Sequence, residues 1–206
     1  MPIYHKQELD NGARVILWHV TETEQELAAP LTLSQRSIDR LSGMSSELHR
    51  RGFLSIRHLL ADQDYTDHDL TYTDDGRPRL PGKEYVSITH SFEFTGIIIA
   101  PFPIGIDIER QRDKILRIAH KFIRYEQLPV PKYDRIQRLT QIWCAKESIY
   151  KLLSIPGLSF RNNMFVETRV SNMPQTAIVI DNGRRTDYEL RHVTLPGFHC
   201  TYIWQQ

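Results

Sequence analysis

Gly105-Ile106-Asp107-Ile108-Glu109 and, further along the chain, Trp143-Cys144-Ala145-Lys146-Glu147-Ser148-Ile149-Tyr150-Lys151 are the stretches that decide the fold and its chemistry. The first stretch places two carboxylates at alternate positions among isoleucines, and alternate residues of a strand point to the same face. The second has helical spacing, which puts Trp143, Glu147 and Lys151 on one face. Three carboxylates facing two lysines suit a divalent cation bound together with a polyphosphate, because Mg²⁺ prefers oxygen ligands and lysine neutralises the remaining phosphate charge.

The segments around these stretches predict a mixture of strands and helices. The first half predicts a hairpin from Ile3 to Val20 with its turn at Asp10-Asn11-Gly12, a helix over 48–60, and strands over 84–90 and 94–100. The second half predicts, after the acidic strand, helices over 112–124 and 138–153 and three strands between Phe165 and Trp204. Strands and helices without a regular β-α-β alternation favour the α+β class.

The composition is that of a soluble globular protein, with 206 residues, 40% hydrophobic and 25% charged, and a net charge of +1. The longest apolar run, near residues 96–100, is too short to cross a bilayer, and the N-terminus lacks the apolar region of a secretory signal. Two cysteines, Cys144 and Cys200, fit a reduced, cytoplasmic protein, and the nine histidines lack zinc-ligand spacing. We therefore expect no membrane partner.

Together the two stretches resemble the signature of the 4′-phosphopantetheinyl transferases, which move phosphopantetheine from coenzyme A to a carrier-protein serine. That pattern is G-x-D-x-E, followed about forty residues later by W-x-x-K-E-[SA]-x-x-K, and both strings are complete here. Gly76-Arg77-Pro78-Arg79-Leu80 resembles the family's G-K-P-x-L turn, with Arg77 in place of Lys. Ile88-Thr89-His90-Ser91 resembles its S-H-S segment, with Thr89 in place of the first Ser.

The resemblance implies a fold of two similar α+β subdomains related by a pseudo-twofold, with coenzyme A in the cleft between them. The mid-chain position of G-x-D-x-E resembles the two-subdomain type of the family and implies a monomer. The expected subdomains are residues 1–103 and residues 104–206, the second carrying the metal site. Two helical segments, Arg51–Leu60 and Trp143–Leu153, are candidates for equivalent helices in the two halves.

Asp107, Glu109 and Glu147 are the expected Mg²⁺ ligands, because burying like charges is costly without a cation between them. Glu147 is the preferred general base, taking the serine proton directly or through a water, and a water held by Glu109 is the alternative. Lys146 and Lys151 are expected to contact the pyrophosphate of coenzyme A and to stabilise charge on the leaving 3′,5′-ADP.

Four residues of the first half are candidates for binding coenzyme A. By resemblance, His90 contacts a phosphate and Arg77 lies beside the adenine nucleotide. Arg51 and Arg57, on the predicted helix over 48–60, are further candidates for phosphate binding. Trp143 and Cys144 are assigned to packing alone.

A basic segment, residues 110–124, follows the acidic strand and suits an acidic acyl or peptidyl carrier protein. Its cations are Arg110, Arg112, Lys114, Arg117, Lys121 and Arg124. Leu128, Val130 and Tyr133 are expected to add apolar contacts with the carrier. Nucleic acid is a poorer fit, because the whole protein is nearly neutral and has no aromatic-interleaved RNA motif.

Two rival functions are a metal-dependent nuclease and a non-catalytic module that binds carrier protein or coenzyme A. The nuclease arrangement has an acid and a lysine two apart on one strand, whereas Lys151 follows Glu147 by four on a predicted helix. A degenerate homologue should have lost an acid or a lysine of the signature, and none is missing.

Overall fold

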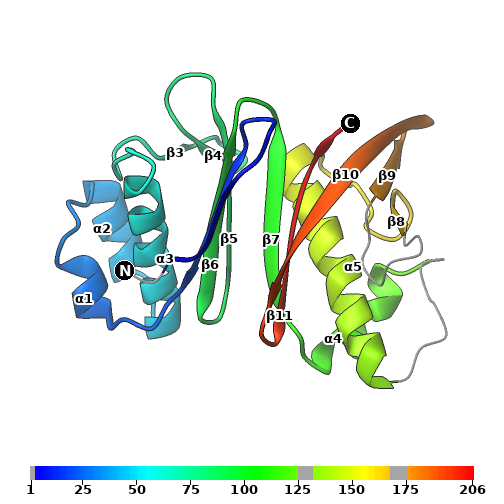
Figure 1. Cartoon of the computed structure of the whole chain (residues 1–206), viewed down its shortest axis with the longest axis horizontal. Coiled ribbons are helices and arrows are strands. Elements are labelled where there is room, and N and C mark those ends of the chain that lie inside the picture. The colour runs from blue at the N-terminus through cyan, green and yellow to red at the C-terminus, as the bar shows by residue number, and fades with distance from the viewer. Residues whose placement is uncertain (1–2, 125–131, 168–175) are drawn as a thin grey trace. The chain divides into compact units, whose positions relative to one another are not determined.

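The computed structural model describes residues 3–124, 132–167 and 176–206. The chain divides into two compact units, Met1–Phe102 and Pro103–Gln206. The boundary expected from the sequence, after residue 103, lies one residue further along. Each unit combines an antiparallel sheet with helices (Figure 1), which confirms the predicted α+β class.

The first unit is a six-stranded antiparallel sheet with helices along one face (Figure 1). Its elements are β1 (Ile3–Glu8), β2 (Arg14–His19), α1 (Glu24–Ala28), α2 (Gln35–Ser42), α3 (Glu47–Ala61), β3 (Thr71–Tyr72), β4 (Pro78–Arg79), β5 (Tyr85–Ser91) and β6 (Phe94–Ala100). The strand order is β1-β2-β6-β5-β4-β3. The predicted N-terminal hairpin is confirmed, and Gly12 in its turn has a φ of +83°, which glycine adopts without a steric cost.

Helix α3 is the helix predicted over 48–60. It begins after Ser46, whose hydroxyl accepts a hydrogen bond from the backbone N–H of His49. Ile56, Leu59 and Leu60 of the predicted apolar stripe are buried against the sheet, whereas Phe53 is buried against Arg57 and Leu48 is half-buried. Burying an apolar side chain of this size contributes about 1.5–3 kcal/mol, so α3 is held to the sheet mainly by this face.

The second unit is a five-stranded antiparallel sheet crossed on one face by a long helix (Figure 1). Its elements are β7 (Ile104–Arg110), α4 (Lys114–Ile118), a 3-10 turn (Ala119–Lys121), α5 (Lys132–Leu153), β8 (Met164–Glu167), β9 (Thr176–Asp181), β10 (Arg184–Leu195) and β11 (Phe198–Gln205). The strand order is β7-β11-β10-β9-β8. The helix predicted over 138–153 therefore begins six residues earlier and ends as expected.

Two predictions for the second unit were wrong. The helix expected over 112–124 is only the short α4 and the 3-10 turn, because Phe122 and Ile123 turn into the core and the carbonyl of Phe122 accepts a hydrogen bond from Lys146. Where three strands were expected between Phe165 and Trp204, the described residues of this stretch form four, because β8 is a separate strand of only four residues that pairs with β9. The Asn182-Gly183 turn between β9 and β10 has positive φ at both residues, as a tight hairpin requires.

The two units have the same connectivity. In the first, β2 leads to α3, and β3 to β6 then return to the sheet in the order β2-β6-β5-β4-β3. In the second, β7 leads to α5, and β8 to β11 return in the order β7-β11-β10-β9-β8. Strand β1 is the addition that distinguishes the first sheet.

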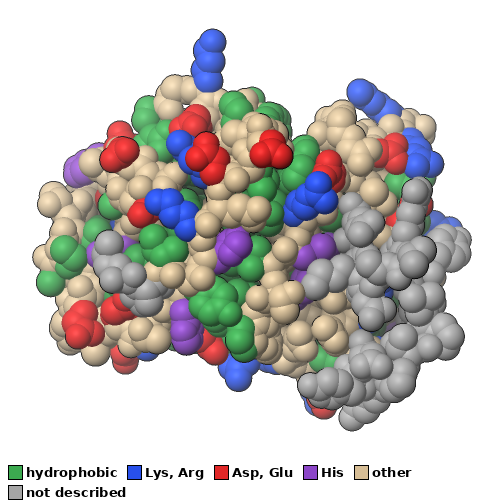
Figure 2. Space-filling view, viewed as in Figure 1, with side chains coloured by type: hydrophobic (Ala, Val, Ile, Leu, Met, Phe, Trp, Pro, Cys, Tyr) green, Lys and Arg blue, Asp and Glu red, His purple; other side chains and the backbone are tan. Residues whose placement is uncertain are grey.

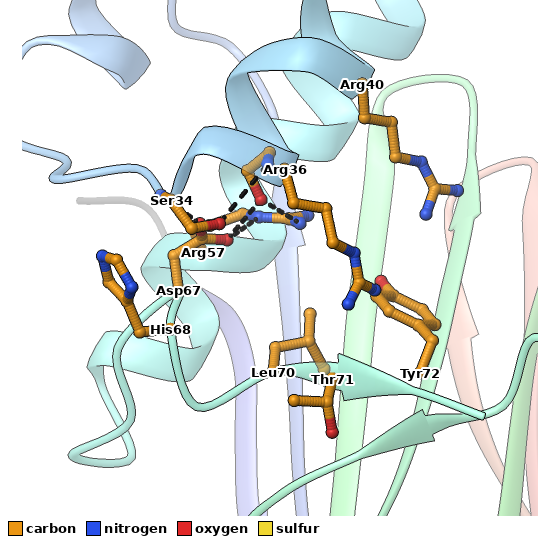
Figure 3. A pocket seen from close by; sticks show the side chains of 10 residues that line it. Ser34, Arg36, Arg40, Arg57, Asp67, His68, Leu70, Thr71 and Tyr72 are labelled. Atoms are coloured by element: carbon orange, nitrogen blue, oxygen red, sulfur yellow. Dashed lines mark hydrogen bonds and ion pairs between the residues drawn. The ribbon is translucent and has the colours of Figure 1, made fainter.

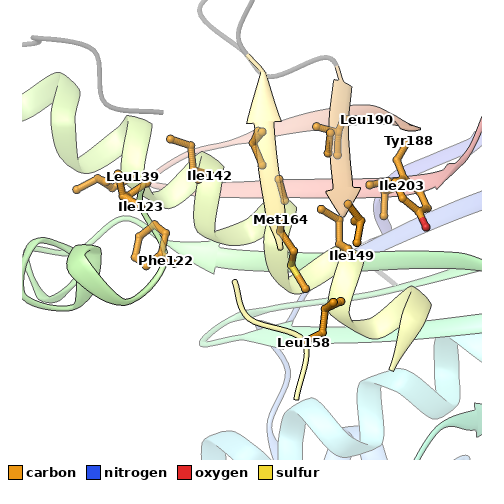
Figure 4. Close-up of a cluster of buried hydrophobic side chains, with 14 of the residues drawn as sticks. Phe122, Ile123, Leu139, Ile142, Ile149, Leu158, Met164, Tyr188, Leu190 and Ile203 are labelled. Carbon is orange, nitrogen blue, oxygen red and sulfur yellow. The ribbon is translucent and has the colours of Figure 1, made fainter. Parts of the chain in front are cut away.

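The core of the second unit lies between α5 and the sheet, closed at one end by the segment after α4 (Figure 4). Phe122, Ile149, Met164, Leu190 and Ile203 are each at most 1% exposed. This burial fixes the face that α5 turns toward β7. Within the described residues, no helix is long and apolar enough to cross a membrane.

Candidate active site

The site begins on β7, where Gly105, Asp107 and Glu109 alternate on one face. Asp107 pairs across the sheet with Thr201 of β11, and Glu109 pairs with His199. Both faces of the strand are covered, because the isoleucines at 104, 106 and 108 are at most 4% exposed. Asp107 is itself only 6% exposed, so its carboxyl group lies in a largely dry environment.

Gly105 allows α5 to lie directly on this face of β7. A Cβ atom at position 105 would lie 2.0 Å from the backbone oxygen of Ser148, which no side chain tolerates. The Sγ of Cys144 donates to the carbonyl oxygen of Asp107 at 3.1 Å, and the hydroxyl of Ser148 donates to that of Thr201 at 2.9 Å. These contacts fix how far α5 is rotated and shifted relative to the strand.

Lys151 projects from α5 onto the strand acids. Its Nζ donates to Oδ1 of Asp107 at 2.7 Å and to the carbonyl oxygen of Ile106 at 3.1 Å. The Lys151 side chain is 29% exposed, whereas that of Asp107 is 8% exposed. Lys151 therefore contacts Asp107 from the boundary between protein and solvent.

Trp143 contacts the second strand acid directly. Its Nε1–H donates to Oε1 of Glu109 at 3.1 Å. The indole also packs between two aromatic rings, with centroid separations of 5.0 Å to Phe122 and 5.3 Å to Phe160. The sequence indicated only the packing role of Trp143. Its place one helical turn before Glu147 was the signal that the indole N–H could also donate to a carboxylate of the site.

The carboxylates perturb one another. Burial, followed by the charge of Asp107, raises the pKa of Glu147 to about 7, although Lys151 opposes the shift. Burial and the same Asp107 charge raise the pKa of Glu109, and the Trp143 hydrogen bond partly offsets this. Glu147 therefore titrates near neutral pH when no cation is bound.

These three side chains have the oxygen chemistry that a hard divalent cation requires. Within the described ranges, however, no group of three or more His, Cys, Asp or Glu side chains is arranged to hold a metal ion. The ammonium of Lys151 lies against Asp107 instead.

Lys146 is placed differently from the prediction. Its side chain is fully buried, and its Nζ donates to the carbonyl oxygens of Phe122 at 2.6 Å and Phe160 at 2.9 Å. An ammonium enclosed in this way cannot reach a phosphate in solvent, so the structure contradicts the predicted pyrophosphate contact. Lys146 joins two backbone segments on either side of Trp143.

A buried histidine that the sequence did not single out lies on the neighbouring strand. Burial, with the nearby His192 and Arg138, lowers the pKa of His199 to about 3, so its imidazole is neutral. Its Nε2 lies 3.0 Å from Nδ1 of His192. Its position opposite Glu109 was not visible before the register of β11 was known.

In the first unit, Arg57 is a structural residue. Its Nε pairs with Oδ1 of Asp67 at 2.8 Å, and its Nη1 donates to the carbonyl oxygen of Phe53 at 3.0 Å. The side chain is 5% exposed, so the structure contradicts the phosphate role suggested for it. The same Asp67 also accepts from the backbone N–H and hydroxyl of Ser34 and so holds the start of α2.

The Arg57–Asp67 pair lies at the base of a cavity of about 180 Å³ (Figure 3). Arg36 and Arg40 of α2 lie beside Tyr72 at its mouth, with guanidinium carbons 4.7 Å and 5.5 Å from the ring centroid. The lining of this cavity comes from α2, α3, β3 and the segment before β3, so no single stretch of the sequence indicated it.

The remaining first-unit candidates are accessible or partly so. Arg51 is half-buried and donates from Nη2 to the carbonyl oxygen of Val20 at 3.0 Å. Arg77 forms an exposed ion pair with Asp75. His90 is exposed, and its ring centroid lies 6.1 Å from that of His49. Their assignment to coenzyme A remains a prediction.

The predicted basic segment is present at the surface of the second unit. All six cations, from Arg110 to Arg124, are exposed, whereas the apolar residues between them, such as Ile115 and Phe122, are buried. Figure 2 shows one face of the surface coloured by side-chain type. Leu128, Val130 and the side chain of Tyr133, predicted to contact the carrier, lie outside the described part of the chain.

The family model described as the 4′-phosphopantetheinyl transferase superfamily matches residues 103–203, which begin at the first residue of the second unit and include β7, α5 and the strands up to β11. No curated protein matches the chain.

Proposed function

Since this chain belongs to the 4′-phosphopantetheinyl transferase superfamily through residues 103–203, we propose that it transfers 4′-phosphopantetheine from coenzyme A to a serine of an apo acyl or peptidyl carrier protein. The serine hydroxyl attacks the β-phosphorus of coenzyme A, and 3′,5′-ADP leaves. The observation that supports the proposal is that Lys151 of α5 contacts Asp107 of β7, while the charge of Asp107 raises the pKa of both Glu109 and Glu147.

Asp107, Glu109 and Glu147 would hold Mg²⁺. The donor set fits, because the pKa values of both glutamates are raised by burial and then by the charge of Asp107, and a bound cation would favour the ionised carboxylates against both. When bound, Mg²⁺ would neutralise and orient the pyrophosphate for in-line displacement.

Glu147 is the preferred general base. Its position on α5, at the half-buried edge of the site, suits contact with a carrier serine. A water held by Glu109 is the second candidate. Lys151, partly exposed beside Asp107, would contact the pyrophosphate and stabilise charge on the departing 3′,5′-ADP.

The first unit would contribute His90, Arg77 and Arg51 to coenzyme A binding, whereas Arg57 and Lys146 serve the fold. The exposed basic segment 110–124 would attract an acidic carrier and steer the encounter. The proposed protein is a cytoplasmic monomer that uses two subdomains of similar connectivity to bind coenzyme A. The repeated strand order of the two units supports this proposal. A non-catalytic homologue that binds carrier protein or coenzyme A is the second candidate.

Intact-mass analysis tests the reaction. An apo acyl carrier protein incubated with the enzyme, coenzyme A and Mg²⁺ should gain one phosphopantetheine. EDTA or Asp107→Ala should abolish the gain. Asp187→Ala, which removes an exposed carboxylate paired with Arg185 on β10, is the matched control and should retain activity. Coenzyme A binding without transfer to several carriers would favour the non-catalytic homologue, and absence of binding would refute both.

A further inference from the structure

We propose that Trp143 is a positioning residue for the cation site, acting through its hydrogen bond to Glu109. The inference rests on the proposed metal role of Glu109. It gives the first residue of the W-x-x-K-E string a task other than filling the core.

The hydrogen bond fixes one oxygen of Glu109. An indole N–H can only donate, and at 3.1 Å from Oε1 it sets the rotation of a carboxylate that a strand side chain would otherwise leave variable. Within the described part of the chain, this is the one hydrogen bond that the Glu109 side chain makes. With Oε1 held, the remaining lone pairs of the carboxylate can be aimed at a cation.

The packing around Trp143, rather than Glu109, fixes the indole. Its ring lies between those of Phe122 and Phe160. The ammonium of Lys146 donates to the carbonyl oxygens of the same two residues, so it ties both segments to α5 on either side of the indole. The direction of the N–H is therefore set before any ligand binds.

Each strand acid consequently has its own partner on α5. Asp107 accepts from Lys151, and Glu109 accepts from Trp143, eight residues earlier on the same helix. The partners differ in one respect: the charge of Lys151 opposes a cation at Asp107, whereas a neutral indole orients Glu109 without competing for the site. Neighbours that orient metal ligands in this way typically change metal affinity about 10–100-fold when removed.

Direct Mn²⁺ binding to the whole protein, measured by calorimetry in the absence of coenzyme A, tests the inference with Trp143→Phe. Phenylalanine keeps an aromatic ring between Phe122 and Phe160 but has no N–H. We expect Mn²⁺ to bind about 10-fold or more weakly. In the transfer assay, the half-saturating Mg²⁺ concentration should rise while kcat at saturating Mg²⁺ stays close to wild type.

Trp18→Phe is the matched control. Its Nε1 donates to Oε2 of Glu22 at 3.2 Å in the first unit, so the substitution removes the same type of bond far along the sequence from the metal ligands. It should leave Mn²⁺ affinity unchanged. Equal Mn²⁺ affinity in wild type and Trp143→Phe would overturn the positioning role alone. A wild-type protein that binds no Mn²⁺ would overturn both the proposed metal site and this inference.

A second measurement leaves Trp143 in place, in case Trp143→Phe fails to fold. The chain has three tryptophans, so Trp18→Phe combined with Trp204→Phe makes Trp143 the sole indole. Its emission should change saturably as Mg²⁺ is added, with the same midpoint as direct binding, and Glu109→Gln should remove the change. Constant emission at a Mg²⁺ concentration that occupies the site would overturn the inference.

Discussion

Replacing Glu147 with glutamine should stabilise the metal-free protein at alkaline pH. The Glu147 carboxylate is half-buried beside Asp107 and Glu109, and this environment raises its pKa from 4.5 to about 7. At about 1.36 kcal/mol per pKa unit, the difference between these two pKa values corresponds to a loss of roughly 3 kcal/mol in the free energy of unfolding once Glu147 is ionised. Because the side chain is partly exposed and solvent screens its charge, we expect about 2 kcal/mol.

The sign follows from proton binding. Below pH 4.5, Glu147 is protonated in the folded and the unfolded protein. Between pH 4.5 and about 7 the folded state holds more protons, so the free energy of unfolding falls as the pH rises. Glutamine resembles the protonated glutamic acid and does not ionise. The free energy of unfolding of Glu147→Gln should therefore exceed that of wild type by about 2 kcal/mol at pH 8, and this difference should shrink toward pH 5.

Urea unfolding in EDTA at pH 5 and pH 8 measures this difference for wild type and Glu147→Gln. Glu8→Gln, at an exposed position on β1, is the control and should follow wild type at both pH values. Adding Mg²⁺ at pH 8 should stabilise wild type but not Glu147→Gln. A variant no more stable than wild type at pH 8, or a gain that does not depend on pH, would refute the reasoning that burial and the charge of Asp107 disfavour the ionised Glu147.

Three further substitutions or treatments test the local structure. Gly105→Ala should lower the free energy of unfolding by about 3 kcal/mol or more in urea, because its Cβ would meet the Ser148 carbonyl; wild-type stability would show that α5 can shift. Lys146→Met should lower the free energy of unfolding, measured in urea, by about 2 kcal/mol and leave the calorimetric affinity for coenzyme A unchanged. A selective loss of affinity would instead support the phosphate contact predicted from the sequence. Cys144 and Cys200 should resist a thiol reagent until urea unfolds the protein, because burial raises the pKa of both; rapid labelling of the native protein would contradict this.

The sequence predicted the elements that carry a strong periodic pattern. The alternation around Asp107 gave β7, and the helical spacing from Trp143 to Lys151 gave the part of α5 that covers it. The sequence also indicated that Lys151 would lie near the strand acids, because two faces defined by spacing were expected to meet. These predictions depended on local geometry, which the order of residues specifies.

The errors came from tertiary contacts that the order of residues does not specify. Lys146 and Glu147 are adjacent in the sequence, but successive helical residues are rotated by about 100°, so one points into the core and the other to the site. Arg57 looked like a surface arginine because its partner Asp67 lies beyond the end of α3. The helix expected after β7 stopped early because the core took up Phe122.

Comparison of the two units shows which features the scaffold itself requires. Trp18 of β2 pairs with Thr95 of β6, as Asp107 of β7 pairs with Thr201 of β11. A serine of the covering helix hydrogen bonds to the threonine in each case, Ser55 to the Thr95 hydroxyl and Ser148 to the Thr201 carbonyl, both at 2.9 Å. The sheet and helix are thus joined in much the same way in both units.

The residues that differ at this junction are the charged ones. Three positions after the helix serine, the first unit has His58, whose ring lies 5.4 Å from that of Trp18, whereas the second has Lys151 bonded to Asp107. The first unit therefore builds the same connectivity with an aromatic pair and no buried carboxylate at this place. Since the scaffold forms without them, the mutually repelling acids of the second unit are a cost to stability that folding does not require. A repulsion retained at one of two equivalent positions is best explained by a ligand that relieves it, and a divalent cation is the simplest ligand of that kind.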